Sequence, residues 1–349
     1  MQEAATAPAV SKDRQAFYDR LDPHALAPLW EVLKGLVPPE PRPRSVAHAW
    51  AYDQVRPLLL EAGALLSAEE AERRVLVLEN PALRGQSRIA GTMYAGVQLV
   101  LPGETAPAHR HTASALRLVL ESEGGFTAVA GERTTMRRGD FIITPSWAWH
   151  DHGNNGERPV IWVDGLDIAL VNFFEAGFGQ GYNDQRQQIT RPEGTALARF
   201  GAGLVPLEAA SPFGATSPIF CYPYERSREA VTALAAAGAP DRHFGHTLRY
   251  ANPLDGGWAM PTIATWLTCL PQGLETQAVR STDAQAIVVL EGEVVAEIGG
   301  RSFPVGENDI LAVPGWTWRR FHASREAILF GFSDRSAQEK LAYWREERR

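Results

Sequence analysis

Two histidines separated by a single residue are the feature most suggestive of chemistry in this chain. His109 and His111 flank Arg110, and the alternation of side chains along a strand places both imidazoles on one face. A third histidine, His150, follows the segment from Gly139 to Pro145. Neutral imidazole is the commonest metal ligand among side chains, so two histidines on one face can share one ion.

The residues around these histidines read as strands. From Arg74 onward, short runs rich in Val, Ile and Leu are broken by Gly, Pro and Asn, at the spacing of an all-β barrel or sandwich. The predicted strands of this region are 75–79, 94–101, 116–121, 127–130, 141–144 and 160–166.

A second strand-rich region repeats the first. Residues 101–103 are echoed at 270–273, and the tryptophan-containing segment 145–149 is echoed at 314–318. A repeat of this length predicts duplicated domains rather than a solenoid. The second-copy equivalents of the three histidines are Val279, Ser281 and Arg319, which form no ligand set, so we expect the second barrel to be free of metal.

The N-terminal part is predicted to be helical, because leucines recur at helical spacing and only the proline-rich piece 37–43 interrupts them. The fold class is therefore all-β with a helical N-terminal extension. The predicted parts are a helical region 1–74, a first barrel with the metal site at 75–171, a connecting segment 172–245 with one helix near 226–236, and a second barrel 246–349 with a C-terminal helix.

Composition excludes several classes of function. The net charge of -7 is spread along the chain without a basic cluster, so we expect no nucleic-acid partner. No stretch approaches the uncharged length of a membrane helix, and the start of the chain does not read as a secretory signal. Only two cysteines occur, Cys221 and Cys269, and they lie far apart without metal-type spacing. This argues against a disulfide framework and fits a reducing cytoplasm.

The segments around the three histidines resemble the two-part motif of the cupin superfamily. The first part has Gly103 before the His-x-His pair, and the second has Gly139 and Pro145 before His150 and Asn154. The resemblance implies a bicupin of two double-stranded β-helix (jelly-roll) barrels. Where the superfamily has a metal-binding glutamate, this chain has Ala115 and Leu116, and Trp147 replaces a glycine.

Without that glutamate, three neutral histidines remain as the implied ligands: His109, His111 and His150. Three protein ligands leave open positions on an iron ion, where a bidentate substrate and dioxygen can bind together. We favour this metal site over purely structural roles for the three histidines. Ligand type alone leaves manganese or nickel open.

A closer resemblance lies in residues 109–117 and 131–136, and it continues from Gly139 to Asn154. These stretches resemble the gentisate 1,2-dioxygenase family of bicupins, which includes salicylate and 1-hydroxy-2-naphthoate dioxygenases. The resemblance implies an Fe(II) enzyme that uses dioxygen to cleave an aromatic hydroxy acid between the carboxyl-bearing carbon and its hydroxylated neighbour, giving maleylpyruvate from gentisate. It also suggests a homotetramer.

Arg117 and His152 are candidates on strand geometry. Arg117 shares the facing of His109 and His111 if the strand is unbroken, so it is placed to pair with the substrate carboxylate; a barrel-edge ion pair is the alternative. His152 shares the face of His150 and is a candidate to bind the ring hydroxyl or move a proton. A fourth metal ligand or a surface residue is the alternative for His152.

The family resemblance carries four further residues to the site. Asp164 is charged within an apolar strand and requires a role or a partner, with Asp167 as the competing candidate. Tyr94 and Gln98, which share one strand face, are implied to contact the ring and its oxygens. Arg73 is implied as a pocket residue, although sequence alone does not separate it from Arg74.

The main functional prediction is gentisate cleavage. Salicylate or 1-hydroxy-2-naphthoate is the alternative substrate, and a non-enzymatic bicupin that binds an aromatic acid is the alternative class. His243 and His246 form no motif with the three histidines and are expected to be structural.

Overall fold

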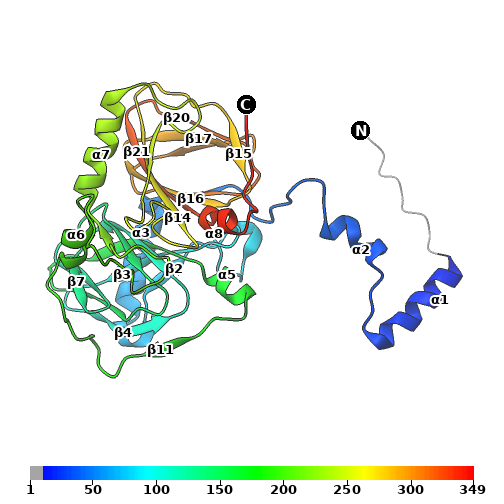
Figure 1. Cartoon of the computed structure of the whole chain (residues 1–349), viewed down its shortest axis with the longest axis horizontal. Coiled ribbons are helices and arrows are strands. Elements are labelled where there is room, and N and C mark those ends of the chain that lie inside the picture. The colour runs from blue at the N-terminus through cyan, green and yellow to red at the C-terminus, as the bar shows by residue number, and fades with distance from the viewer. Residues whose placement is uncertain (1–10) are drawn as a thin grey trace. The chain divides into compact units, whose positions relative to one another are not determined.

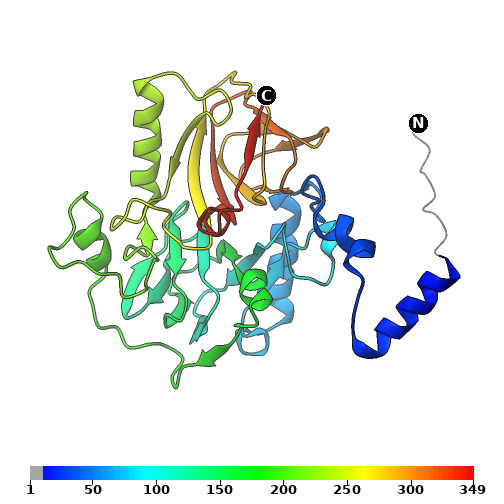
Figure 2. The same ribbon diagram turned by 45° about the vertical axis from the view of Figure 1, so that its right-hand side comes forward.

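The computed structural model describes residues 11–349, which form two compact units that divide between Arg42 and Pro43 (Figures 1 and 2). The first unit contains α1 (Lys12–Leu21), the 3-10 helix η1 (Asp22–His24) and α2 (Leu29–Leu36). Ser11 caps α1, because its hydroxyl accepts the backbone N–H of Arg14.

The second unit, 43–349, consists of two β-barrels. Its helices are α3 (Tyr52–Leu65), α4 (Ala68–Ala71), η2 (Pro81–Leu83), α5 (Ile168–Phe173), α6 (Thr195–Phe200), α7 (Tyr224–Ala237) and α8 (Arg335–Lys340). No helix among the described residues is long and apolar enough to cross a membrane.

The first barrel is made of two antiparallel sheets (Figure 1). The six-stranded sheet has the order β12 (Cys221–Tyr222), β8 (Phe141–Thr144), β5 (Ala115–Glu121), β10 (Val160–Leu166), β3 (Tyr94–Val100) and β2 (Val75–Val77). The five-stranded sheet has the order β11 (Gly179–Gly181), β4 (Thr105–His111), β9 (His150–Asn154), β6 (Gly125–Val129) and β7 (Glu132–Thr135).

The second barrel repeats this plan. Its six-stranded sheet has the order β1 (His48–Trp50), β19 (Ile310–Val313), β16 (Gln285–Glu291), β21 (Ala327–Ser333), β14 (Ala264–Leu270) and β13 (His246–Arg249). Its five-stranded sheet has the order β18 (Arg301–Val305), β17 (Val294–Ile298), β20 (Arg319–His322), β15 (Val279–Ser281) and β22 (Glu346–Arg348).

The largest hydrophobic core lies between the two six-stranded sheets. It joins Leu118 and Phe141 of the first barrel to Val288 and Phe330 of the second. Because these strands are covered on both faces, they read in the sequence as continuous apolar runs rather than as alternating patterns. Two smaller cores fill the interiors of the individual barrels, one around Trp162 and one around Leu311.

Each barrel contains one strand that comes from the segment before the other barrel. β1 comes before the first barrel but pairs with β19 of the second, whereas β12 comes before the second barrel but pairs with β8 of the first. The helix after each of these strands makes an equivalent hydrogen bond. The Tyr52 hydroxyl of α3 donates to the Glu121 carboxylate, and the Tyr224 hydroxyl of α7 donates to the Glu291 carboxylate. The structural repeat is therefore longer than the sequence echoes.

The predicted bicupin fold is confirmed. All six predicted strands are present, with boundaries that differ by at most a few residues, and the helix predicted near 226–236 is α7. The stretch 11–74 is mostly helical but also contains the strand β1, and the connecting stretch contains β11, β12 and α6 besides α7.

Candidate functional site

The three predicted metal ligands meet inside the first barrel. His109 on β4 pairs directly with His150 on the neighbouring strand β9, and His111 lies two residues further along β4. One ligand nitrogen from each ring can be chosen so that all three lie within 4.8 Å of one another. The ring centroid of His150 is 4.1 Å from that of His109 and 4.9 Å from that of His111.

Backbone carbonyls orient two of these rings. Nδ1 of His111 is 2.7 Å from the carbonyl oxygen of Ala113, and Nδ1 of His150 is 2.9 Å from that of Ala148. Each Nδ1–H donates to its carbonyl, which leaves Nε2 as the unprotonated ligand nitrogen. Nε2 of His150 is buried without a hydrogen-bond partner, as expected for a nitrogen that binds a metal ion.

The site keeps its histidines neutral. Burial, together with the charges of Arg73 and Arg117, lowers the pKa of His109 to about 3. Burial also lowers the pKa of His111 and of His150. Because a metal binds the unprotonated ring, these three nitrogens fit a divalent cation at neutral pH.

Arg117 and Asp164 form a buried ion pair in the same interior. Nε of Arg117 is 3.5 Å from Oδ1 of Asp164, and the two side chains are 4% and 7% exposed. Nη1 of Arg117 also donates to the Thr144 hydroxyl at 2.5 Å. Burial raises the pKa of Asp164 to about 6, against the lowering effect of Arg117.

The expectation that Arg117 continues the strand of the histidines is wrong. β4 ends at His111 and β5 begins at Ala115, so Arg117 lies in the other sheet of the barrel. It still faces the interior, because its neighbours Leu116 and Leu118 point into the core between the barrels.

His152 lies on β9 and is buried next to Thr127 of β6. Its Nδ1 is 2.7 Å from the Thr127 hydroxyl, which also donates to the carbonyl of Asp151 at 3.1 Å. A hydroxyl has one proton, so it accepts the Nδ1–H of His152. The Nε2 atom of His152 is then an acceptor.

Tyr94 and Gln98 lie on β3, spaced by an even number of residues and opposite β10. Nε2 of Gln98 is buried and lacks a hydrogen-bond partner. Burial raises the pKa of the Tyr94 hydroxyl, and Asp164 raises it further. Tyr94 therefore keeps its proton at neutral pH and can donate a hydrogen bond.

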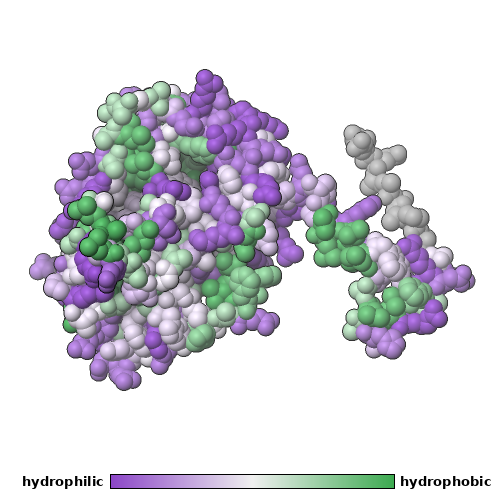
Figure 3. Space-filling model, viewed as in Figure 1, coloured by the Kyte–Doolittle hydropathy of each residue, from purple (hydrophilic) through white to green (hydrophobic). Residues whose placement is uncertain are grey.

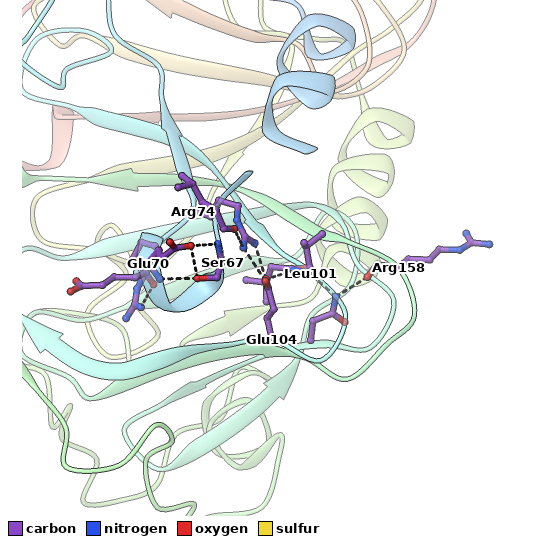
Figure 4. A network of polar contacts seen from close by, with 11 residues as sticks. Ser67, Glu70, Arg74, Leu101, Glu104 and Arg158 are labelled. Atoms are coloured by element: carbon purple, nitrogen blue, oxygen red, sulfur yellow. Dashed lines mark hydrogen bonds and ion pairs between the residues drawn. The ribbon is translucent and has the colours of Figure 1, made fainter. Parts of the chain in front are cut away.

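The structure separates the two neighbouring arginines. Nη2 of Arg73 lies 2.5 Å from Nδ1 of His109 and also donates to the Pro107 carbonyl. Arg74 is held in an ion pair with Glu104 at 2.8 Å, and Glu104 also accepts the N–H of Leu101 (Figure 4). Arg73 is thus the arginine at the histidine site.

Asp167 makes contacts that differ from those of Asp164. It accepts the backbone N–H of Ser114 at 2.7 Å and the hydroxyl of Thr262, a residue of the second repeat, at 2.5 Å. Both of its carboxylate oxygens are therefore occupied: Oδ1 accepts a hydrogen bond from within the first repeat, and Oδ2 accepts one from the second repeat.

Trp147, which stands where the cupin motif has glycine, adopts a left-handed backbone with φ 62°. This conformation favours glycine and is strained for a large side chain. The indole is held from two sides, with the Phe178 ring centroid at 4.5 Å and the Arg110 guanidinium at 4.4 Å. Trp316 in the second repeat also has a positive φ.

Several residues around the site were not among the predicted site residues. Thr127 and Thr144 hold His152 and Arg117, and β11 covers the edge of β4 by pairing Gly179 with His111. The alternation of side chains along β6 and β8 is a signal that could have identified the two threonines as facing the interior. The short strand β11 gave no such signal, because Gly-Gln-Gly has no apolar pattern.

The second barrel shows the expected replacement of the ligands. Val279 pairs with Arg319 across β15 and β20, in the register that pairs His109 with His150 in the first barrel. No group of three or more potential metal-ligating side chains is found there among the described residues.

The fold and the site define a class, namely a double cupin protein with one three-histidine centre. The cupin domain family matches residues 96–168 and 266–330, one match in each barrel. The chain is 50% identical over 341 residues to gentisate 1,2 dioxygenase 1 of Aquipseudomonas alcaligenes, covering 98% of each protein.

Two other similarities agree with this class. The chain is 33% identical to a 5-aminosalicylate 1,2-dioxygenase of Comamonas sp, with 96% of this chain and 90% of that protein covered. It is 32% identical to salicylate 1,2-dioxygenase from Pseudoaminobacter salicylatoxidans, a structure with gentisate, with a TM-score of 0.91 over 99% of this chain and 96% of that one. The chain belongs to the gentisate 1,2-dioxygenase family, which confirms the resemblance inferred from its motifs.

Proposed function

We propose that this protein is an Fe(II)-dependent dioxygenase that cleaves gentisate between the carboxyl-bearing carbon and the adjacent hydroxylated carbon, giving maleylpyruvate. The observation that carries the proposal is a group of three neutral histidines within electrostatic reach of the buried Arg117. When bound, iron supplies a Lewis acid and one-electron chemistry with dioxygen. His109, His111 and His150 would hold it, and they bring no negative charge.

The substrate supplies the charge that these ligands lack. An ortho-hydroxybenzoate presents a carboxylate and a neighbouring phenolic oxygen, which together chelate a metal and neutralise it. Arg117 is proposed to bind the carboxylate, because arginine pairs with carboxylates through charge-assisted hydrogen bonds. The free Nε2 donor of Gln98 and the protonated Tyr94 hydroxyl are proposed to bind ring oxygens.

His152 is proposed to move a proton, and Asp164 is proposed to position Arg117. The Nε2 atom of His152 is the acceptor for a ring hydroxyl proton, since Thr127 holds Nδ1–H. Asp164 keeps Arg117 in place through the ion pair. Arg73 is proposed to orient His109 and to add positive charge near the bound anion.

The test is oxygen uptake by the iron-loaded protein with gentisate under air. We expect one dioxygen consumed per gentisate and a new absorbing ring-opened product; absence of turnover after anaerobic Fe(II) loading would contradict the proposal. His150→Ala should lose bound iron and turnover together. His322→Ala, at an exposed position on β20, is the matched control and should retain both.

A second candidate substrate is supported by the relatives. Several of the similar proteins are named for salicylate, 5-aminosalicylate or 1-hydroxy-2-naphthoate rather than for gentisate. A panel of these acids under the same conditions decides between them. Gentisate should give the highest kcat/KM, and a higher value for another acid would transfer the proposal to that substrate.

We also propose a homo-oligomer, with the tetramer as the expected form. The support is the apolar face of α2, where Leu29, Trp30, Leu33 and Leu36 are all exposed (Figure 3). Monomers rarely leave such a patch uncovered. In analytical ultracentrifugation the full chain should sediment as a tetramer, and the variant Trp30→Ala/Leu33→Ala should sediment as a smaller species.

The predicted cytoplasmic location also remains a proposal, supported by two free cysteines.

A further inference from the structure

The second barrel, which lacks the metal ligands, contains a cavity of about 420 Å³. This volume lies in the range of small-molecule sites, about 300–1,000 Å³. Its lining includes Trp266, Thr268, Arg319, Phe321 and Leu329. The cavity is thus walled by strands β14, β20 and β21 of this barrel.

These lining positions correspond to the site of the first barrel. Thr268 pairs with Leu329 in the register that pairs Gln98 with Trp162. The cavity is therefore the second-barrel counterpart of the histidine site, with a different set of side chains. Phe321 of β20 pairs with Ala296 of β17 in the register that pairs His152 of β9 with Thr127 of β6, so Phe321 stands at the position of His152.

Arg319 provides a positive charge at the position of the ligand His150. It is only 7% exposed, and the hydrogen bond found for its guanidinium among the described residues is a long one, from Nη1 to the Ser281 hydroxyl at 3.4 Å. A guanidinium has five N–H donors, so most of them remain available. A buried charge of this kind is costly unless an anion accompanies it.

Asp283, a buried carboxylate that also lines the cavity, attracts Arg319 without forming a close ion pair with it, and the charge of Arg319 lowers the pKa of the Asp283 carboxyl. Asp283 accepts the indole N–H of Trp344 and the amide of Gln285, both at 3.0 Å. Within residues 11–349, Arg319 makes no ion pair with any carboxylate. Arg319 faces the cavity with donor capacity that the protein itself does not use.

Besides Asp241, Asp283 and Arg335, the lining offers apolar side chains that suit a flat ring. The rings of Phe244, Trp266 and Phe321 line the cavity, and Arg249 adds a second positive charge at an exposed position of the lining. Nδ1 of His243, which also lines the cavity, is buried and lacks a hydrogen-bond partner. This nitrogen can bind a polar substituent of a ligand.

We propose that the cavity of the second barrel is a metal-independent binding site for a small aromatic monocarboxylate, whose carboxylate pairs with the Arg319 guanidinium. The Arg319 guanidinium, at the position of the ligand His150, would attract the carboxylate as the metal ion would in the first barrel. The inference rests on the second barrel alone and does not depend on the proposed iron chemistry.

Benzoate is the probe, because it has the carboxylate and the ring but no neighbouring hydroxyl for chelation. Titration calorimetry on the full-length protein should show benzoate binding that weakens by about tenfold or more in Arg319→Gln, since a charge-assisted pair is lost. Arg117→Gln/Asp164→Asn, which removes both charges of the buried pair, is the matched variant of the first barrel, and this binding should persist in it.

A second variant keeps the test valid if Arg319→Gln does not fold. Leu329→Trp places in the cavity the side chain that the first barrel accommodates at the equivalent position, Trp162, while it retains Arg319. It should also abolish this benzoate site. Undiminished benzoate binding in Leu329→Trp, loss of the binding in Arg117→Gln/Asp164→Asn, or no binding to the wild type would each overturn the proposal.

Discussion

Arg117 and Asp164 face each other across the paired strands β5 and β10, with 3.5 Å between Nε and Oδ1. Both of these atoms are buried, and neither makes a hydrogen bond. The pair is therefore close enough for charge attraction but incompletely satisfied. An incoming carboxylate can take up the donor capacity of Arg117 while Asp164 limits the movement of its side chain.

Replacing Arg117 should separate stability from binding. Arg117→Gln leaves Asp164 as a buried carboxylate without its cation, which should lower the free energy of unfolding by about 3–5 kcal/mol. The double variant Arg117→Gln/Asp164→Asn should recover most of this loss but not the affinity for gentisate. Urea denaturation and KM measure the two effects, and a single variant as stable as the wild type would mean that the pair is not charged.

The pH profile should report Asp164. Its folded-state pKa of about 6 lies above the ordinary 3.8, so it becomes protonated as the pH falls through about 6 and then no longer holds Arg117 by charge. We expect kcat/KM to fall about tenfold per pH unit below this point. Asp164→Asn should have a lower plateau without this limb.

The raised pKa of Asp164 has the opposite effect on stability: the free energy of unfolding should rise, not fall, as the pH is lowered from about 6 toward 3.8. Because the folded pKa is raised, the folded protein takes up the proton more readily than the unfolded chain, so the cost of burying Asp164 is present above about pH 6 and is relieved as the pH falls toward 3.8.

Two controls apply to the activity profile. The iron content measured at each pH separates the fall of kcat/KM from loss of metal. If kcat/KM of Asp164→Asn still falls below about pH 6, the titrating group is not Asp164.

The motif residues could be predicted from the sequence because their spacing follows strand geometry. His109 and His111 share a face by alternation, and the echo at residues 314–318 identified the equivalent of His150 as Arg319. The duplicated barrels followed from the same echoes. Local periodicity and repeated glycine, proline and tryptophan positions carry this information.

The exchanged strands could not be predicted in this way. β1 is only three residues long and pairs with β19, more than half the chain away, so no local pattern identifies its partner. The break between β4 and β5 was missed because the alternation of His109, His111 and Arg117 is compatible with one continuous strand. Long-range packing decides both features.

The neighbouring arginines Arg73 and Arg74 should differ in function. Arg73→Gln removes the contact with His109, so we expect a reduced kcat/KM with nearly unchanged stability. Arg74→Gln breaks the ion pair with Glu104, in which the arginine side chain is 4% exposed, and should lower stability by about 3–5 kcal/mol. Thermal or urea unfolding and gentisate turnover distinguish them, and the reverse assignment would place Arg74 at the site.

Two threonines make equivalent contacts across the repeats. Thr262 donates to Asp167 at 2.5 Å, and Thr92 donates to Asp334 at 2.8 Å. The acceptor carboxylates are matched further, because Asp167 accepts the N–H of Ser114 and Asp334 accepts that of Ala284. Thr92→Val and Thr262→Val should therefore each lower the free energy of unfolding by a similar amount, about 1–3 kcal/mol.

Only one of these two substitutions should affect the metal centre. Asp167 holds Ser114 in the turn after the ligand His111, so Thr262→Val loosens a turn next to the first-barrel site, whereas Thr92→Val loosens the turn of the metal-free barrel. We expect Thr262→Val to weaken iron binding severalfold and Thr92→Val to leave it unchanged. Equilibrium dialysis with Fe(II) under anaerobic conditions measures this, and equal iron affinity in the two variants would show that the turn does not position His111.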